Sequence, residues 1–179
     1  MREILCDYLD TLYYNVPNTI SIGTTILLFI GALFVMIFCK RDKFRNVFRL
    51  FLLFYVFQLY STTVFYRRVN KDVKYNYSLF WSYDKPELIA ENILNVIVFI
   101  PIGLLIGLGF TKIKWWQVMV VGLSISILVE FLQLILKRGF SELDDVIHNT
   151  LGCLIGYGIY LLLKTGYKLC IVRVKNENN

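Results

Sequence analysis

The sequence predicts an all-α protein, a polytopic membrane helix bundle of about five transmembrane helices with the N-terminus outside and the C-terminus cytoplasmic. Apolar residues make up 57% of the 179 residues and charged residues only 18%, whereas an ordinary soluble domain has roughly 25% charged residues. Several stretches of about 18 or more residues carry at most one charge, a length that crosses a hydrocarbon core about 30 Å thick. This pattern excludes a soluble enzyme, a disordered tail and a disulfide scaffold, and it predicts one transmembrane domain over residues 1–179.

The first two apolar runs cover residues 19–39 and 44–66. A mixture of acidic and basic residues precedes the first run, in place of the basic segment of a signal peptide, and no small-residue cleavage site ends it. We therefore expect a retained span. The second run is rich in Phe, Leu and Tyr, and Arg49 lies close enough to its start for the side chain to reach back to the interface.

Three further apolar runs cover residues 93–110, 115–136 and 145–163. The helix that contains the first of them is expected to begin near Pro86, because Asp84 precedes that proline as a cap. The last is expected to open with a capping box formed by Ser141 and Asp144, and Asp145 adds a charge that suits the amino-terminal end of the helix dipole.

The distribution of charge predicts the orientation, because basic residues in short loops resist translocation. Ten basic residues lie in the loop after the first span, in the turn between the third and fourth spans and in the tail, and Arg49 brings the total to eleven, against two acidic residues, Asp42 and Glu177. The opposite side has eight basic and ten acidic residues outside the spans. The net charge of +6 is thus concentrated on the expected cytoplasmic side, and no nucleic-acid partner is expected.

The four cysteines are scattered without CxxC spacing, and only Cys6 falls in an expected outer aqueous segment. Neither a disulfide framework nor a zinc site is predicted, and no metal or other cofactor is expected.

Small residues and a proline predict how the helices pack. The pairs Gly103-xxx-Gly107 and Gly152-xxx-Gly156 permit close backbone approach between helices. Pro101 removes one backbone hydrogen bond inside the third helix and is able to kink it. Structural roles are therefore expected for Pro101, Gly103, Gly152 and Gly156.

Polar residues near the membrane gather at its expected outer half. They come from the outer ends of the second to fifth helices, and helices that alternate in direction bring such residues to one level. We therefore predict a single outward-facing pocket that binds a ligand. Its expected ligand-binding residues are Arg67, Asn92, Asn95, Glu130, Gln133, Arg138, Asp144, Asp145 and Asn149.

Glu130 is the most informative member of this set. It lies roughly 9 Å below the outer end of its helix by the rise per residue, and an ionisable group at that depth normally faces a partner or a water-filled cavity. The alternative is a helix-packing hydrogen bond made by a protonated carboxyl group. If the protein is an enzyme, Glu130 and Asp145 are the catalytic candidates.

Three motifs carry a resemblance to a known family. They are Asn92-Ile93-Leu94-Asn95-Val96 running into Phe99-Ile100-Pro101-Ile102-Gly103, then Glu130-Phe131-Leu132-Gln133, then Arg138 followed by Asp144-Asp145-Val146 and Asn149-Thr150-Leu151-Gly152 with Gly156. In this order they resemble the VanZ-like family over about residues 67–163. The resemblance implies a small multi-pass protein of the bacterial cell membrane, and the founding member of that family is linked to reduced susceptibility to teicoplanin-type glycopeptide antibiotics. It does not supply a biochemical activity.

Three functions are compatible with these features. The favoured one is a binding or shielding protein that engages a membrane lipid, a lipid-linked cell-wall precursor or a lipoglycopeptide antibiotic at the outer leaflet. The second is an intramembrane enzyme acting on a polyprenyl phosphate or a peptidoglycan precursor, with Glu130 as general base and Asp144, Asp145 and His148 as metal ligands. The third is transport, which the apolar cytoplasmic halves of the spans disfavour. The sequence sets no oligomeric state.

Overall fold

The computed structural model describes residues 41–67, 69–84 and 86–177. Four of its helices are long and apolar enough to cross a membrane, over Phe44–Phe65, Leu88–Gly109, Trp115–Ile135 and Leu143–Tyr167. The predicted helical membrane fold is confirmed, and four of the five expected spans are present. The first expected span, residues 19–39, lies outside the described residues.

The helices and strands follow in a simple order along the chain. The helices are α2 (Arg41–Tyr60), which continues into the π-helix η1 (Ser61–Phe65), the 3-10 helix η2 (Trp81–Asp84), α3 (Pro86–Gly109), α4 (Trp115–Ile135) and α5 (Leu143–Glu177). The strands are β1 (Tyr75–Asn76) and β2 (Ser141–Glu142). The expected start of the third span helix at Pro86 is confirmed.

The chain divides into two compact units. The first contains α2, η1, both strands and the last part of α4, and the second contains η2, α3, the rest of α4, and α5 from Asp144 onward. Since α4 and α5 each run from one unit into the other, the units are not consecutive blocks of sequence. The single transmembrane domain stays a prediction.

In the first unit, the second span ends in a π-helical turn because three consecutive hydroxyl side chains compete for backbone carbonyls. The hydroxyl groups of Ser61, Thr62 and Thr63 donate to carbonyl oxygens three or four residues earlier, at 2.7 to 3.1 Å. Such bonds loosen the regular helical ladder, and π-turns often lie at functional positions. This turn presents carbonyl groups to side chains of another segment.

The first unit also contains the C-terminus of α4, where the helix ends in a tight turn. Lys137 adopts a positive φ of 53°, the Lys137 amide donates to Leu134 and the Arg138 amide donates to Gln133. This pair of bonds is a Schellman motif, which ends the helix at Ile135. Lys137 therefore follows the helix and does not extend the polar face that carries Glu130 and Gln133.

The segment after α4 pairs with the loop that follows the second span. Strands β1 and β2 are parallel, with Tyr75 opposite Ser141 and Asn76 opposite Glu142. The Ser141 amide donates to the Lys74 carbonyl oxygen at 3.1 Å. The expected capping box is therefore wrong: Ser141 is a strand residue, its amide has a backbone partner, and α5 begins two residues later.

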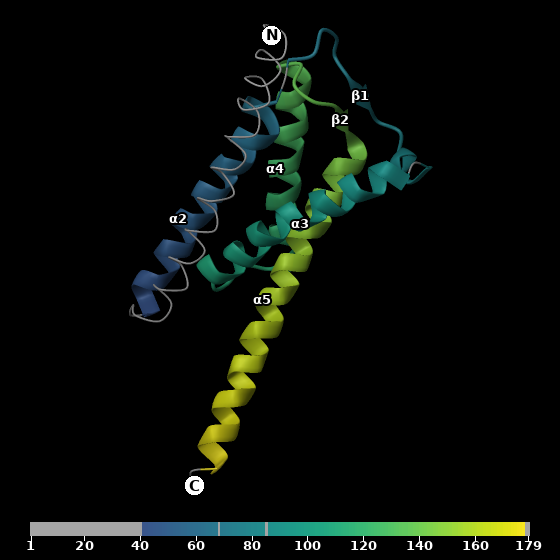
Figure 1. Ribbon diagram of the computed structural model, residues 1–179. Coiled ribbons are helices and arrows are strands. Elements are labelled where there is room, and N and C mark those ends of the chain that lie inside the picture. The colour runs from purple at the N-terminus through teal and green to yellow at the C-terminus, as the bar shows by residue number, and fades with distance from the viewer. Residues whose placement is uncertain (1–40, 68, 85, 178–179) are drawn as a thin grey trace, which may run out of the picture. The chain divides into compact units, whose positions relative to one another are not determined.

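In the second unit, α3 lies obliquely across the first half of α5 (Figure 1). Glycines make this crossing close. A Cβ atom on Gly152 would overlap the Val96 carbonyl, one on Gly156 would overlap the Ile100 carbonyl, and one on Gly103 would overlap the carbonyl of Cys153. The two backbones therefore touch, and Pro101 lies within α3 at this crossing.

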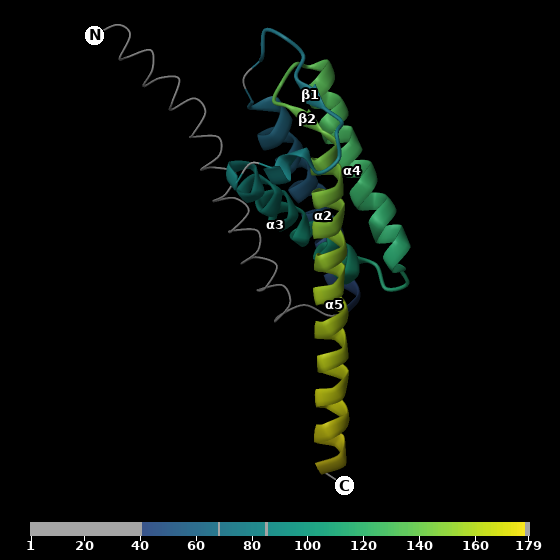
Figure 2. The ribbon, with the colours of Figure 1, turned by 90° about the vertical axis from the view of Figure 1, so that its right-hand side faces the viewer.

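Helix α5 extends beyond residue 163, where the expected apolar run ends, and Figure 2 shows it continuing past the end of α3. Its last turns are rich in Lys, Tyr and Val, and no proline follows to stop the helix. A charged tail ends the apolar run without ending the helix. The predicted apolar run lies inside α5, and the expected acidic first turn with Asp144 and Asp145 is confirmed.

Apolar side chains are distributed as a lipid environment requires. Between 22% and 44% of the residues in each apolar window are buried, and large side chains such as Leu53 and Phe57 are exposed. In water such a surface would cause aggregation, whereas in a bilayer it contacts acyl chains. The helices are therefore those of an integral membrane protein.

Candidate functional site

The nine expected ligand-binding residues fall into two groups, one in each unit. The first, which we call the Gln133 cluster, consists of Arg67, Glu130, Gln133 and Arg138, together with Gly139. The second, which we call the Asp144 cluster, consists of Asn92, Asn95, Asp144, Asp145 and Asn149, together with Ser82, Ser126 and His148. The single pocket shared by all nine residues stays a prediction.

In the Gln133 cluster, Glu130 is buried and has a backbone partner. The Glu142 amide donates to Glu130 Oε2 at 2.9 Å, and the Glu142 side chain is buried as well. The bond joins the last part of α4 to the residue immediately before α5. A carboxyl group is therefore held where the chain turns into the next helix.

Gln133 lies one turn further along α4, and only one of the two polar groups of its side-chain amide has a hydrogen-bond partner among the described residues. Its side-chain amide donates to the Thr63 carbonyl at 3.0 Å, a carbonyl that the π-turn leaves available. Its Oε1 atom is buried and accepts no hydrogen bond from the described residues. A buried amide oxygen without a hydrogen-bond donor reduces stability by roughly 1–3 kcal/mol, so a donor at this atom would be stabilising.

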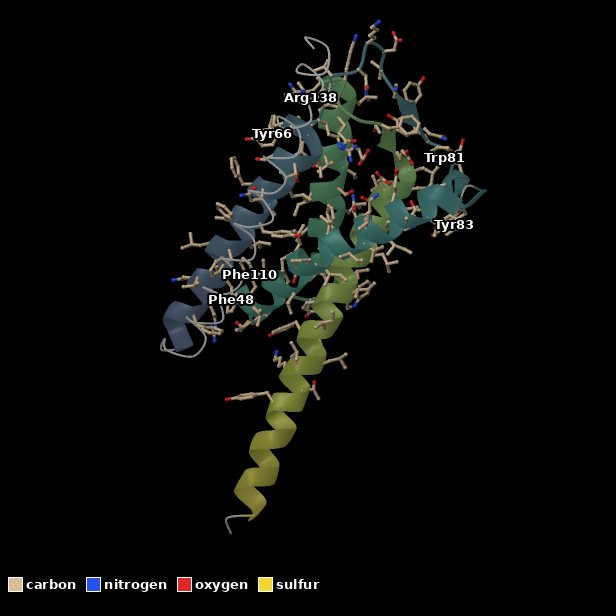
Figure 3. All side chains as sticks on the ribbon, in the orientation of Figure 1. Phe48, Tyr66, Trp81, Tyr83, Phe110 and Arg138 are labelled. Carbon is tan, nitrogen blue, oxygen red and sulfur yellow. The ribbon has the colours of Figure 1, made fainter. Side chains whose placement is uncertain are left out.

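The two arginines of the cluster differ in their contacts. The Arg138 guanidinium donates to the Phe65 carbonyl at the end of η1, and Figure 3 labels Arg138 and Tyr66 at this end of the unit. The exposed Arg67 side chain packs against Gly139, whose φ is 88°. A Cβ atom on Gly139 would lie 2.6 Å from an Arg67 guanidinium nitrogen and 3.4 Å from Gln133 Cδ. Gly139 thus permits both the turn and the approach of the arginine.

In the Asp144 cluster, the fully buried carboxylate of Asp144 anchors residues 78–83, which lie shortly before α3 and which we call the aromatic segment. Asp144 accepts hydrogen bonds from the Phe80 amide at 2.7 Å, the Ser82 hydroxyl at 2.7 Å and the Ser82 amide at 3.4 Å. Asn92 of α3 donates to the Ser82 hydroxyl oxygen at 2.9 Å. Phe80 holds a φ of 61°, a costly conformation for an aromatic residue, at the point where its amide meets the carboxylate.

His148 lies one turn beyond Asp144 and binds the same aromatic segment. Its Nδ1 atom is 2.7 Å from the Asp144 carbonyl oxygen, which only accepts, so Nδ1 carries a proton. In the neutral ring Nε2 then accepts from the Tyr83 hydroxyl at 2.9 Å. Tyr83 and Trp81 are labelled together in Figure 3, where the aromatic segment lies.

The rest of the Asp144 cluster links three helices of the second unit. Asn95 of α3 donates to Asp145 Oδ1 at 2.7 Å, and Asn149 of α5 donates to the Ser126 hydroxyl oxygen of α4 at 2.8 Å. The Asn149 Oδ1 atom is buried without a partner among the described residues. The five predicted residues of this cluster therefore do converge.

The metal site considered with the enzyme hypothesis does not form in the described part of the chain. No three His, Cys, Asp or Glu side chains there are placed to hold one ion. Asp144 binds the aromatic segment, Asp145 binds Asn95, and both ring nitrogens of His148 have partners.

Sequence reasoning missed two residues of the clusters, Ser82 and Gly139. Ser82 is an ordinary serine in an aromatic loop, and only its proximity to the helix start at Pro86 was a signal. Gly139, two residues beyond Lys137, carried a stronger one, because a glycine shortly after a helix end is typical of a turn with positive φ.

Comparisons with known proteins agree on one family. The sequence profile of the VanZ/LLP1 family matches residues 25–164. Protein VanZ of Enterococcus faecium is 39% identical to this chain over 70 residues, which are 39% of this chain and 44% of that protein, so the match spans less than half of that relative. No solved structure matches the chain. Since the profile covers most of its length, the chain belongs to the VanZ/LLP1 family.

Proposed function

We propose that this protein lies in the bacterial cell membrane and binds or shields a lipid-linked component of the cell envelope, or a lipid-tailed glycopeptide antibiotic, at the outer leaflet. The observation that carries the proposal is the anchoring of the aromatic segment by Asp144. A buried carboxylate holds this segment beside polar side chains of α3 and α5, so an exposed aromatic surface is fixed next to a hydrogen-bonded polar cluster.

The aromatic surface has the composition of a membrane interface. Phe80 is 57% exposed and Tyr83 is 51% exposed, although both belong to an anchored segment. Tyrosine and tryptophan side chains concentrate at the level of lipid headgroups, where one end of the ring is apolar and the other is hydrated. A lipid-tailed ligand presents the same combination of an apolar chain and a polar head.

Family membership supports the link to glycopeptides. The similarity to Protein VanZ covers 70 residues, and the resistance attached to that family name comes to this chain only as part of the proposal. The enzymatic alternative has less support, because Asp144 and His148 are engaged by the aromatic segment and are not directed toward a shared metal.

Expression in a glycopeptide-susceptible Gram-positive host tests the proposal. We expect the minimum inhibitory concentration of a lipid-tailed glycopeptide to rise at least about fourfold, with little change for a glycopeptide that has no lipid tail. Asp144→Ala should abolish the increase, because it releases the aromatic segment. Gly158→Ala is the matched control, since a Cβ atom there meets nothing within 4 Å. Unchanged susceptibility to both drugs, with the protein present in the membrane, would contradict the antibiotic branch.

A further inference from the structure

We infer that Arg67 and Gln133 form a two-point site for a phosphate ester that carries a neighbouring O–H or N–H donor, the chemistry of a phospholipid or glycolipid headgroup. The inference rests on the proposed function and specifies which chemical group the Gln133 cluster recognises. It is built from one cation and one acceptor of the first unit that have no hydrogen-bond partner among the described residues.

The first point of the site is the Arg67 guanidinium. The side chain is exposed, and it forms no hydrogen bond or ion pair with any residue in the described part of the chain. Arg138 nearby is already committed to the Phe65 carbonyl. Arg67 follows the apolar window Phe44–Phe65 by two residues, which places it at the depth of lipid phosphates. A planar guanidinium grips two phosphate oxygens at once.

The second point of the site is the Oε1 atom of Gln133. The Gln133 side chain is 4% exposed, its amide nitrogen is fixed by Thr63, and its oxygen has no partner among the described residues. The fixed nitrogen leaves the amide no freedom to flip. An acceptor held in this way selects a ligand with a donor and gives nothing to a bare phosphate.

Gly139 brings the two points together. The position where its side chain would begin lies 2.6 Å from an Arg67 nitrogen and 3.4 Å from Gln133 Cδ. One ligand group therefore reaches both residues within a single headgroup. The Gln133 oxygen is buried, so binding at both points requires the exposed Arg67 side chain, which packs against the neighbouring Gly139, to swing toward the phosphate. This motion breaks no side-chain hydrogen bond with the described residues.

Calorimetry with short-chain lipids tests the first point. The purified protein in detergent micelles is titrated with dihexanoyl phosphatidylglycerol, whose headgroup combines a phosphate with hydroxyl groups. Arg67→Gln should weaken binding about tenfold, the loss expected for a charge-assisted hydrogen bond. Arg67→Lys should lose less, and it keeps the test decisive if Arg67→Gln fails to fold. Arg49→Gln, at an exposed arginine within α2, is the matched control and should bind like the unsubstituted protein.

A second lipid tests the acceptor. Dihexanoyl phosphatidylmethanol carries the same charge without a hydroxyl group, and it should bind several-fold more weakly to the unsubstituted protein. Gln133→Leu should remove this preference while it keeps binding of phosphatidylmethanol. Equal binding of the two lipids by the unsubstituted protein, or equal losses in Arg67→Gln and Arg49→Gln, would overturn the two-point site.

Soluble sn-glycerol 3-phosphate separates the possible sources of the phosphate. Binding as tight as that of the lipid assigns the site to soluble phosphate esters, whereas much weaker binding assigns it to a lipid headgroup, and either result retains the two points. No binding of any of these compounds, together with an intact effect on glycopeptide susceptibility, would defeat this inference and leave the proposed function standing.

Discussion

At the scale of single residues, two of the three acidic side chains that are buried in the described part of the chain, Glu130 and Asp144, are residues that the sequence singled out, and Glu142 is the third. Glu130, Asp144 and Asp145 stand out in the sequence because carboxylates are costly inside or beside an apolar run. The partners of Asp144 and Glu130 did not stand out, because Ser82 is a neutral side chain and the Glu142 amide is a backbone group. The partner of Asp145, Asn95, was among the predicted residues. The sequence therefore identified the acidic residues but not the hydrogen-bond partners of Asp144 and Glu130.

Glu130→Gln distinguishes a packing role from a role that needs charge. Glutamine keeps an oxygen that accepts the Glu142 amide, and it keeps the volume of the side chain. We expect expression and melting temperature to stay near those of the unsubstituted protein while any effect on glycopeptide susceptibility is lost. Asp145→Asn should behave in the same way, and Gln133→Ala should have a milder effect. A fully active Glu130→Gln protein, assayed beside an inactive Arg67→Ala protein, would remove the acid from the site.

Asp144→Ala tests whether one carboxylate anchors the aromatic segment. Removal of three hydrogen bonds to a buried charge should cost about 3 kcal/mol locally, which corresponds to about a 100-fold faster amide exchange. Hydrogen exchange over residues 78–83 measures this change. Asp72→Ala, in the exposed part of the same loop, is the control and should leave exchange there unaltered. Unchanged protection in Asp144→Ala would mean that other contacts hold the segment.

At the scale of elements, hydropathy predicted the apolar helices and could not predict how they end. The π-turn at Ser61–Phe65 depends on where three hydroxyl groups find carbonyls, and the short pairing of β1 with β2 joins segments about 65 residues apart. Neither feature leaves a periodic signal in two to five residues. Helix α5 extends past its apolar run because a change of solvent, from lipid to water, does not itself end a helix.

The crossing of α3 and α5 makes a prediction about helix packing. Gly156→Leu places a side chain against the Ile100 carbonyl and should destabilise the protein by at least about 2 kcal/mol, because backbone atoms have to move apart. Thermal unfolding in detergent measures the loss. Gly158→Leu, on the same helix with open space around its Cα, should melt near the unsubstituted protein. Equal melting temperatures for the two variants would show that the close crossing does not contribute to stability.

At the scale of the whole molecule, the orientation in the membrane decides what the two clusters can meet. The charge bias predicts that the loop after the second span lies outside and that the turn before α4 lies in the cytoplasm. Both clusters include residues from the loop side: Arg67 begins that loop, and Ser82 lies near its end. An outer position exposes them to envelope lipids and antibiotics, and an inner position would expose them to soluble metabolites.

Cysteine labelling in intact cells tests this orientation. After replacement of the native cysteines, a cysteine at the exposed position Asp72 should react with a membrane-impermeant thiol reagent, and one at the exposed position Lys112 should react only after the membrane is opened. Asp42, in the basic loop after the first expected span, should behave like Lys112. Reaction at Asp42 and Lys112 together with protection at Asp72 would invert the topology. The Gln133 and Asp144 clusters would then open toward the cytoplasm, where an external glycopeptide has no access.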